Sequence, residues 1–125
     1  MICNLCRSNT ASSFKTLDNK TYWSCNVCGC KYLDKSYFID PAEEEQRYLE
    51  HNNDIKDNEY RAFLSRLSDP LKEKISPGSN GLDFGCGTGP ALADMLTQDG
   101  FKVELYDPFF FPDEGALSKQ YDFIT

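Results

Sequence analysis

Hydrophobic and polar positions follow three different patterns along the chain. In residues 1–38, apolar and aromatic side chains occur in short runs around a polar turn at 18–20, which predicts short β-strands. In residues 40–75, apolar positions recur every three or four residues, which predicts amphipathic helices. In residues 81–125, apolar runs flank one helical pattern, which predicts a strand, helix and strand unit.

A first helix is predicted after residue 39. Asp40-Pro41, with Glu43 three residues after the aspartate, has the pattern of a capping box. The helix should run to about His51 and stop at Asn52-Asn53. His51 is the only histidine. At the end of a helix it favours a charge–dipole contact on the surface, and a catalytic role is the alternative.

A second helix should start near Asp57 and bury one apolar stripe. Asp69-Pro70 should restart the pattern, because proline suits the first turn of a helix. We expect these helices to serve packing. The stripe consists of Tyr60, Phe63, Leu64 and Leu67, continued by Leu71 and Ile75.

A glycine-rich turn carries the strongest functional signal in the second half. The stretch 81–90, GLDFGCGTGP, reads as a strand that enters a tight turn, with Pro90 as the first residue of a helix. The helix would bury Leu92, Met95 and Leu96 and end at Asp99-Gly100. Glycines let the backbone approach a ligand, and the N–H groups at a helix start favour a polar or anionic group.

The second strand of the unit, residues 101–106, ends at Asp107. This acid lies 22 residues after Gly85 and at the carboxyl edge of the sheet. In nucleotide-binding folds an acid at about that distance accepts hydrogen bonds from ribose hydroxyls. Residues 109–111 are three phenylalanines that either cover an adenine face or pack under the neighbouring helix. A short helix at 113–120 and a further strand at 121–125 should follow.

Four of the six cysteines form two Cys-x2-Cys pairs. Their spacing fits paired zinc knuckles that hold one tetrahedral Zn²⁺, and the alternative is free or redox-active thiols. Four cysteine ligands leave no open coordination position, so the zinc would be structural. Cys30 is close enough in sequence to compete with Cys28. The predicted ligands are Cys3, Cys6, Cys25 and Cys28.

The net charge of −7 is unevenly distributed. Residues 1–38 hold five basic and two acidic side chains, a formal +3, whereas residues 39–125 hold a formal −10. An acidic body argues against a broad nucleic-acid footprint. The start has no basic segment followed by an apolar run, and no later run is long enough to cross a bilayer. We therefore expect a soluble, cytoplasmic protein without a membrane partner.

The second half resembles class I S-adenosylmethionine-dependent methyltransferases. The residues that carry the resemblance are the acid and alternating glycines Asp83, Gly85, Gly87 and Gly89. The resemblance implies that the glycines contact the methionine part of the cofactor and that Asp83 binds its amino group. It also implies that Asp107 holds the ribose hydroxyls. The main alternative to a methyltransferase site is a dinucleotide-binding site. Its G-x-G-x-x-G pattern requires a third glycine at position 90, which is Pro90 in this chain.

Two departures from that family limit the resemblance. Few residues separate Asp107 from Tyr121, so the usual third strand should be missing or very short. Residues 121–125 look like the opening of the fourth strand, which lies next to the first in the family. The strands and helices that carry much of the acceptor site would come later, so we expect an amino-terminal, truncated portion that binds the cofactor weakly and transfers no methyl group.

The expected architecture is α/β, with a partial Rossmann-like parallel sheet preceded by a small β-rich zinc ribbon and a helical segment. The predicted boundaries are 1–38 for the ribbon, 39–79 for the helical connection and 80–125 for the cofactor-binding part. The methyl acceptor stays open: Tyr22, Trp23 and Lys31 favour RNA, whereas the acidic remainder favours a small molecule. The alternative function is a non-catalytic zinc-binding or nucleic-acid interaction module, with self-association through an exposed sheet edge.

Overall fold

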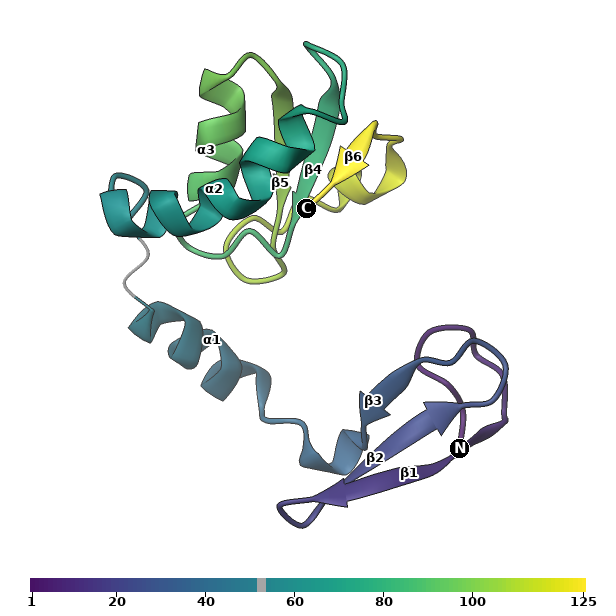
Figure 1. Cartoon of the computed structure of the whole chain (residues 1–125). Helices are drawn as coiled ribbons and strands as arrows, with labels where there is room; N and C mark the ends of the chain where they lie inside the picture. Colours follow the sequence, from purple (N-terminus) through teal and green to yellow (C-terminus); the bar gives the residue numbers. More distant parts are fainter. Residues whose placement is uncertain (52–53) are drawn as a thin grey trace. The chain divides into compact units, whose positions relative to one another are not determined.

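The computed structural model describes residues 1–51 and 54–125, and the predicted stop at Asn52-Asn53 lies outside them. The chain divides into two compact units, Met1–Glu43 and Glu44–Thr125 (Figure 1). Each unit contains a three-stranded sheet, antiparallel in the first and parallel in the second. No helix among the described residues is long and apolar enough to cross a membrane.

Unit 1 is a small antiparallel sheet with the strand order β1-β2-β3. Its strands are β1 (Ala11–Leu17), β2 (Lys20–Cys25) and β3 (Lys31–Leu33). Asp18 and Asn19 join β1 to β2 with positive φ angles of 49° and 61°, which matches the right-handed twist of a tight hairpin. The predicted short strands are therefore confirmed, and a single 3₁₀ turn, η1 (Lys35–Tyr37), follows them.

The first predicted helix is α1 (Pro41–Glu50). Asp40 caps it, since the Ala42 N–H donates to Asp40 Oδ1 at 2.9 Å. His51 follows the last helical residue and is exposed, as expected for a residue at the end of a surface helix.

The second helix, α2 (Asn58–Lys72), begins where the sequence predicts, with Asp57 accepting the N–H groups of Glu59 and Tyr60. The predicted restart at Asp69-Pro70 is wrong, because α2 continues through Pro70. Pro70 lies in the last turn and interrupts only one backbone bond there. Leu64, Leu71 and Ile75 pack on one core cluster, so contacts on both sides of the proline hold the helix in register.

The predicted apolar stripe of α2 is only partly buried. Leu64 packs on the core, but Phe63 is 60% exposed and Leu67 is 49% exposed. Ser68, which the pattern places outside the stripe, is fully buried. The buried face is therefore rotated toward Ser68, and a small side chain there permits close approach of the helix.

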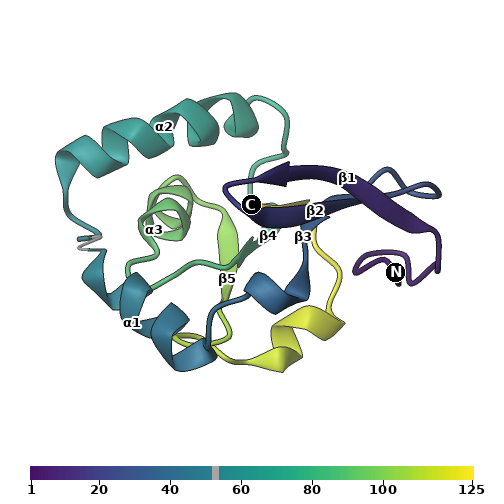
Figure 2. The same ribbon diagram turned by 90° about the horizontal axis from the view of Figure 1, so that it is seen from below.

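Unit 2 is built on a parallel sheet with the order β5-β4-β6. β4 (Asn80–Phe84), α3 (Ala91–Gln98) and β5 (Lys102–Tyr106) form the predicted βαβ unit. Helices α2 and α3 lie on one side of the sheet and the 3₁₀ segment η2 (Glu114–Ser118) lies on the other (Figure 2). Pro90 is the N-cap residue of α3, so the helix begins at Ala91, one residue later than predicted.

The strand after β5 pairs directly with β4. β6 (Phe123–Ile124) runs parallel to it, with Gly81 opposite Phe123 and Leu82 opposite Ile124. The described residues between β5 and β6 form a loop and η2 but no strand, so the expected loss of the third strand is confirmed. The core cluster between sheet and helices consists of Leu92, Leu96, Phe101 and Phe123. This arrangement is a partial Rossmann-like α/β fold, as the sequence predicts.

Candidate functional site

The glycine turn leaves the carboxyl end of β4 and leads into α3. Gly85 and Gly87 adopt φ angles of +79° and +68°, whereas a Cβ atom at either position would meet nothing within 4 Å. The turn therefore needs glycine for its left-handed conformation rather than for space inside the protein. The N–H groups of Gly85 and Cys86 both donate to Tyr106 O, at 2.7 and 3.2 Å, which fixes the turn to the end of β5. Gly89 is buried and lies two residues before α3.

Asp83 is the acid of β4 and is only 8% exposed. Burial raises the pKa of its carboxyl group, while the Thr125 hydroxyl and the Ala93 N–H lower it by a smaller amount. A buried carboxylate whose pKa is raised is stabilised by a cationic group placed beside it. The chemistry of this position therefore fits an ammonium group.

Asp107 directly follows β5 at the same edge of the sheet and is 7% exposed. Its Oδ1 accepts the N–H groups of Phe109 and Phe110 at 2.9 and 3.1 Å, and its Oδ2 accepts that of Gly87 at 3.1 Å. The carboxylate thus joins β5, the glycine turn and the following loop. Oδ2 keeps one lone pair for a ligand hydroxyl. The sequence gives no sign of these three bonds, because they depend on a loop conformation.

Cys86 lies in the turn near both acids, and the sequence pattern does not mark it as a functional residue. Burial raises the pKa of its thiol to about 11, and the charges of Asp83 and Asp107 add to the effect. Both carboxylates are therefore close enough to act on one side chain of the turn. The structure brings the predicted acids and glycines together at one end of β4 and β5.

The loop of three phenylalanines is anchored to Asp107. Phe111 and Asp107 exchange two backbone hydrogen bonds of 3.0 Å each. The Phe109 ring lies 6.4 Å from that of Tyr48 in α1 and 6.1 Å from that of Phe110. These contacts favour the packing alternative for Phe109. Coverage of an adenine face stays a prediction.

The predicted zinc ligands form one cluster in unit 1. The four sulfur atoms all lie within 4.8 Å of one another. Cys3 Sγ lies 3.7 Å from Cys28 Sγ, and Cys6 Sγ lies 3.6 Å from Cys25 Sγ. Four thiolates about 2.3 Å from a tetrahedral Zn²⁺ would be about 3.8 Å apart, so the donor set and its spacing fit this ion.

The thiols of the cluster have unequal pKa values. Hydrogen bonds led by the Ser8 hydroxyl lower the pKa of Cys25 to about 5. The N–H of Cys30 lowers the pKa of Cys28, but burial and the neighbouring sulfurs outweigh it and raise that pKa to about 12. Crowded sulfurs resist joint ionisation unless a cation is present.

Cys30 does not belong to the group of four sulfur atoms. Its carbonyl accepts the Cys25 N–H at 2.9 Å and so helps to close the second knuckle. The predicted competition of Cys30 with Cys28 is therefore not supported by the geometry of the described residues.

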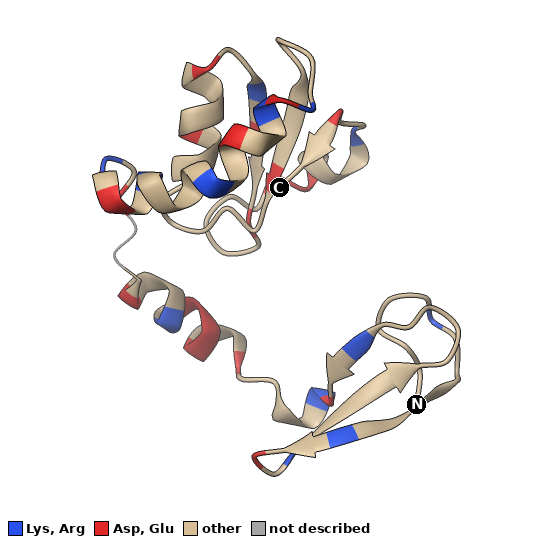
Figure 3. Ribbon diagram, in the orientation of Figure 1, with Lys and Arg blue, Asp and Glu red and all other residues tan. Residues whose placement is uncertain are grey.

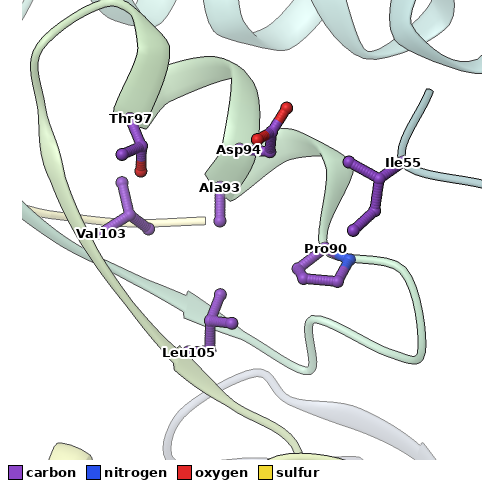
Figure 4. A pocket seen from close by; sticks show the side chains of 7 residues that line it. All are labelled: Ile55, Pro90, Ala93, Asp94, Thr97, Val103 and Leu105. Carbon is purple, nitrogen blue, oxygen red and sulfur yellow. The ribbon is translucent and has the colours of Figure 1, made fainter.

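A pocket of about 260 Å³ lies between α3 and β5 (Figure 4). Apolar side chains dominate its lining, and the carboxylate of Asp94 at its rim is held by Arg61 at 2.6 Å. None of the five residues predicted to bind the cofactor lines this pocket. Its lining residues are Ile55, Pro90, Ala93, Asp94, Thr97, Val103 and Leu105.

Comparison with known protein families matches residues 34–125 to a methyltransferase domain. No curated protein and no solved structure matches the chain. The family match covers more than half of the chain, including the whole parallel sheet and the glycine turn. The chain belongs to the methyltransferase-domain family, with a class I type of fold.

Proposed function

We propose that the chain is the amino-terminal portion of an S-adenosylmethionine-dependent methyltransferase. In this proposal, unit 1 holds a structural Zn²⁺ and unit 2 supplies the first half of the cofactor site. The observation that carries it is the pair of buried acids, Asp83 and Asp107, at the carboxyl ends of adjacent parallel strands beside the glycine turn. Ligands of open α/β sheets bind at this edge.

Each predicted contact has a chemical reason. The methionine part of the cofactor carries an ammonium group, which would compensate the burial of the Asp83 carboxylate. The backbone of Gly85 and Gly87 has no Cβ atoms to keep the ligand away. Asp107 Oδ2 would accept one ribose hydroxyl through its remaining lone pair. The site would therefore recognise the methionine part and the ribose of the cofactor separately.

Methyl transfer from a sulfonium depends mainly on holding the methyl carbon in line with the acceptor atom. The described residues beside the turn supply groups that orient the cofactor. His51, the only histidine, is exposed at the end of α1 and is not one of the residues that form the turn. We therefore propose weak cofactor binding and no turnover by these 125 residues alone.

Calorimetric titration of the full chain with S-adenosylhomocysteine tests the binding part of this proposal. We expect measurable heat for the unmodified chain and weaker binding for Asp107→Asn, whose amide places a donor where Oδ2 now accepts. Asp113→Asn is the matched control. Asp113 caps η2 through the Gly115 N–H at 2.9 Å, and asparagine caps a helix equally well.

Two outcomes would contradict the proposal. The first is the absence of heat at millimolar ligand with a folded chain, and the second is equal weakening by Asp107→Asn and Asp113→Asn. Incubation with radiolabelled S-adenosylmethionine and RNA or small-molecule acceptors tests the other part, because label transfer by this chain would refute the predicted lack of turnover.

A further inference from the structure

The three lysines of the ribbon sheet lie on one face. Each strand carries one of them, and none of the three strands contains an acidic residue. In the strand register Lys15 is opposite Tyr22, Lys20 is opposite Leu17 and Lys31 is opposite Ser24. Because side chains alternate along a strand, positions 20, 22 and 24 of β2 point to the same side. We call this side, formed by Lys15, Lys20, Lys31, Phe14 and Tyr22, the lysine face.

Phe14 joins the lysine face through a bulge in β1. The register of β1 against β2 shifts between Ser13 and Lys15. The Nζ atom of Lys31 lies 4.5 Å from the centroid of the Phe14 ring, which places both side chains on the same side of the sheet. Phe14 is nevertheless 52% exposed. An aromatic ring accessible to solvent therefore lies beside the positive charges.

Side chains on the opposite face of the sheet form hydrogen bonds with other segments of unit 1. The Trp23 indole N–H donates to Asp34 Oδ2 at 2.7 Å, and the Tyr32 hydroxyl donates to Ile2 O at 3.2 Å. Trp23 follows Tyr22 in β2 and so points away from the lysine face. Of the three residues that favour RNA in the sequence, only Tyr22 and Lys31 therefore lie on the lysine face.

The lysine face is also electrostatically unpaired. Among the described residues, Lys15, Lys20 and Lys31 form no ion pair, whereas Lys72 and Lys119 in unit 2 each contact a carboxylate at 2.8 Å. In the coloured ribbon of Figure 3, Lys and Arg positions occur on the strands of unit 1, and Asp and Glu positions occur on the helices and loops of the rest of the chain. An anionic partner would find its complementary surface on this sheet.

We propose that the lysine face binds single-stranded nucleic acid. The lysines would contact phosphates, and Phe14, with Tyr22 beside it, would stack on a base. The exposed aromatic ring is what favours a nucleic acid over an acidic protein segment, since a peptide carboxylate gains nothing from that ring. The proposal depends only on unit 1 and goes beyond the cofactor site.

The expected strength follows from the number of charges. Three phosphate contacts predict that log K falls with log salt with a slope of about −2, from a factor of 0.7 per contact on a single strand. Loss of one lysine should lower the binding constant about fivefold at 0.1 M salt. Loss of the stacked ring should lower it by at least about fivefold.

Fluorescence anisotropy with the zinc-loaded full chain tests the proposal. The probes are labelled RNA and DNA single strands of about ten nucleotides with the same sequence, titrated across a range of salt concentrations. Lys15→Gln and Lys31→Gln should each weaken binding and flatten the salt slope, and Phe14→Leu should weaken binding without changing the slope. Lys35→Gln and Tyr37→Leu, both in η1, are matched controls that should bind like the unmodified chain.

Zinc content and Trp23 emission report whether each variant retains a folded ribbon. Binding of neither strand at low salt would overturn the proposal, as would equal effects of Lys31→Gln and Lys35→Gln. If polyglutamate competes as well as RNA and Phe14→Leu changes nothing, the face binds an acidic protein instead. The Lys and Phe variants should bind S-adenosylhomocysteine unchanged, so the two proposals can fail independently.

Discussion

Replacement of Gly81 by alanine should destabilise unit 2, because a methyl group there has no space. A Cβ atom at this position would lie 2.7 Å from Phe123 Cε1 and closer still to Cζ and Cε2. The Phe123 ring is 8% exposed and packs edge to face on Phe101, with ring centroids 6.2 Å apart. It can move away only by breaking contacts in the core cluster.

The magnitude follows from overpacking. An extra methyl group in a packed core costs about 1–3 kcal/mol, which is a large part of the stability of a small domain. With an m-value of about 2 kcal/mol/M, a cost of about 2 kcal/mol lowers the urea midpoint by about 1 M. Helical circular dichroism follows unit 2, which contains α2 and α3, whereas Trp23 fluorescence follows unit 1.

A double-mutant cycle with Phe123→Leu identifies the cause. The smaller side chain removes the ring that the new methyl group would strike, so Gly81→Ala should cost less in that background, with a coupling of about 0.5–3 kcal/mol. Asn80→Ala, an exposed position in the same strand, should stay within about 0.5 kcal/mol of the unmodified chain. An unchanged midpoint for Gly81→Ala, or an equal cost in both backgrounds, would refute the reasoning.

Three further predictions concern the two sites. Cys25→Ser should abolish stoichiometric zinc and change Trp23 emission, whereas Cys30→Ser should retain the metal, and equal zinc contents would contradict the four-cysteine site. Asp83→Asn should raise the free energy of unfolding at neutral pH. Because the pKa of Asp83 is raised in the folded chain, the unfolded chain loses the Asp83 proton at a lower pH than the folded chain does. The free energy of unfolding therefore falls as pH rises from the unfolded-state pKa to the folded-state pKa of this group. Urea midpoints should therefore converge below the ordinary aspartate pKa of about 3.9, and a pH-independent difference would exclude this cause. Asp107→Asn should cost about 1.5–3 kcal/mol even without cofactor, because the Gly87 N–H loses a charged acceptor, and a cost no larger than that of Asp113→Asn would show that the bond is unimportant.

The helical segment shows where pattern reading succeeds and where it fails. Asp57 begins α2 as predicted, since a capping side chain acts on N–H groups two and three residues away. The restart at Asp69-Pro70 is wrong, because packing of Leu71 and Ile75 on the core decides whether a proline ends a helix. The exposure of Phe63 and the burial of Ser68 likewise depend on which side of α2 meets α3.

The functional residues likewise include some that the sequence predicts and others that depend on the tertiary structure. The two cysteine pairs converge as their spacing predicts, because four ligands of one ion need only short knuckles and one hairpin to meet. The role of Asp107 as an acceptor of three backbone N–H groups could not be foreseen. The bonds require the loop of residues 108–111 to turn back on the strand. The division of Tyr22 and Trp23 between two faces follows from strand alternation, but which face stays open depends on Ile2 and Asp34.

By itself, the sequence determined the local units of this protein: the cysteine knuckles, the hairpin, the capped helices and the strand, glycine turn and helix. Those features depend on interactions between residues close together in the chain, where spacing and backbone preference suffice. Only the tertiary structure decided that β6 pairs with β4, that Gly81 makes room for Phe123, and that Asp83 and Asp107 lie near Cys86 of the glycine turn. These contacts join segments 20 or more residues apart, and their geometry depends on how the whole unit packs.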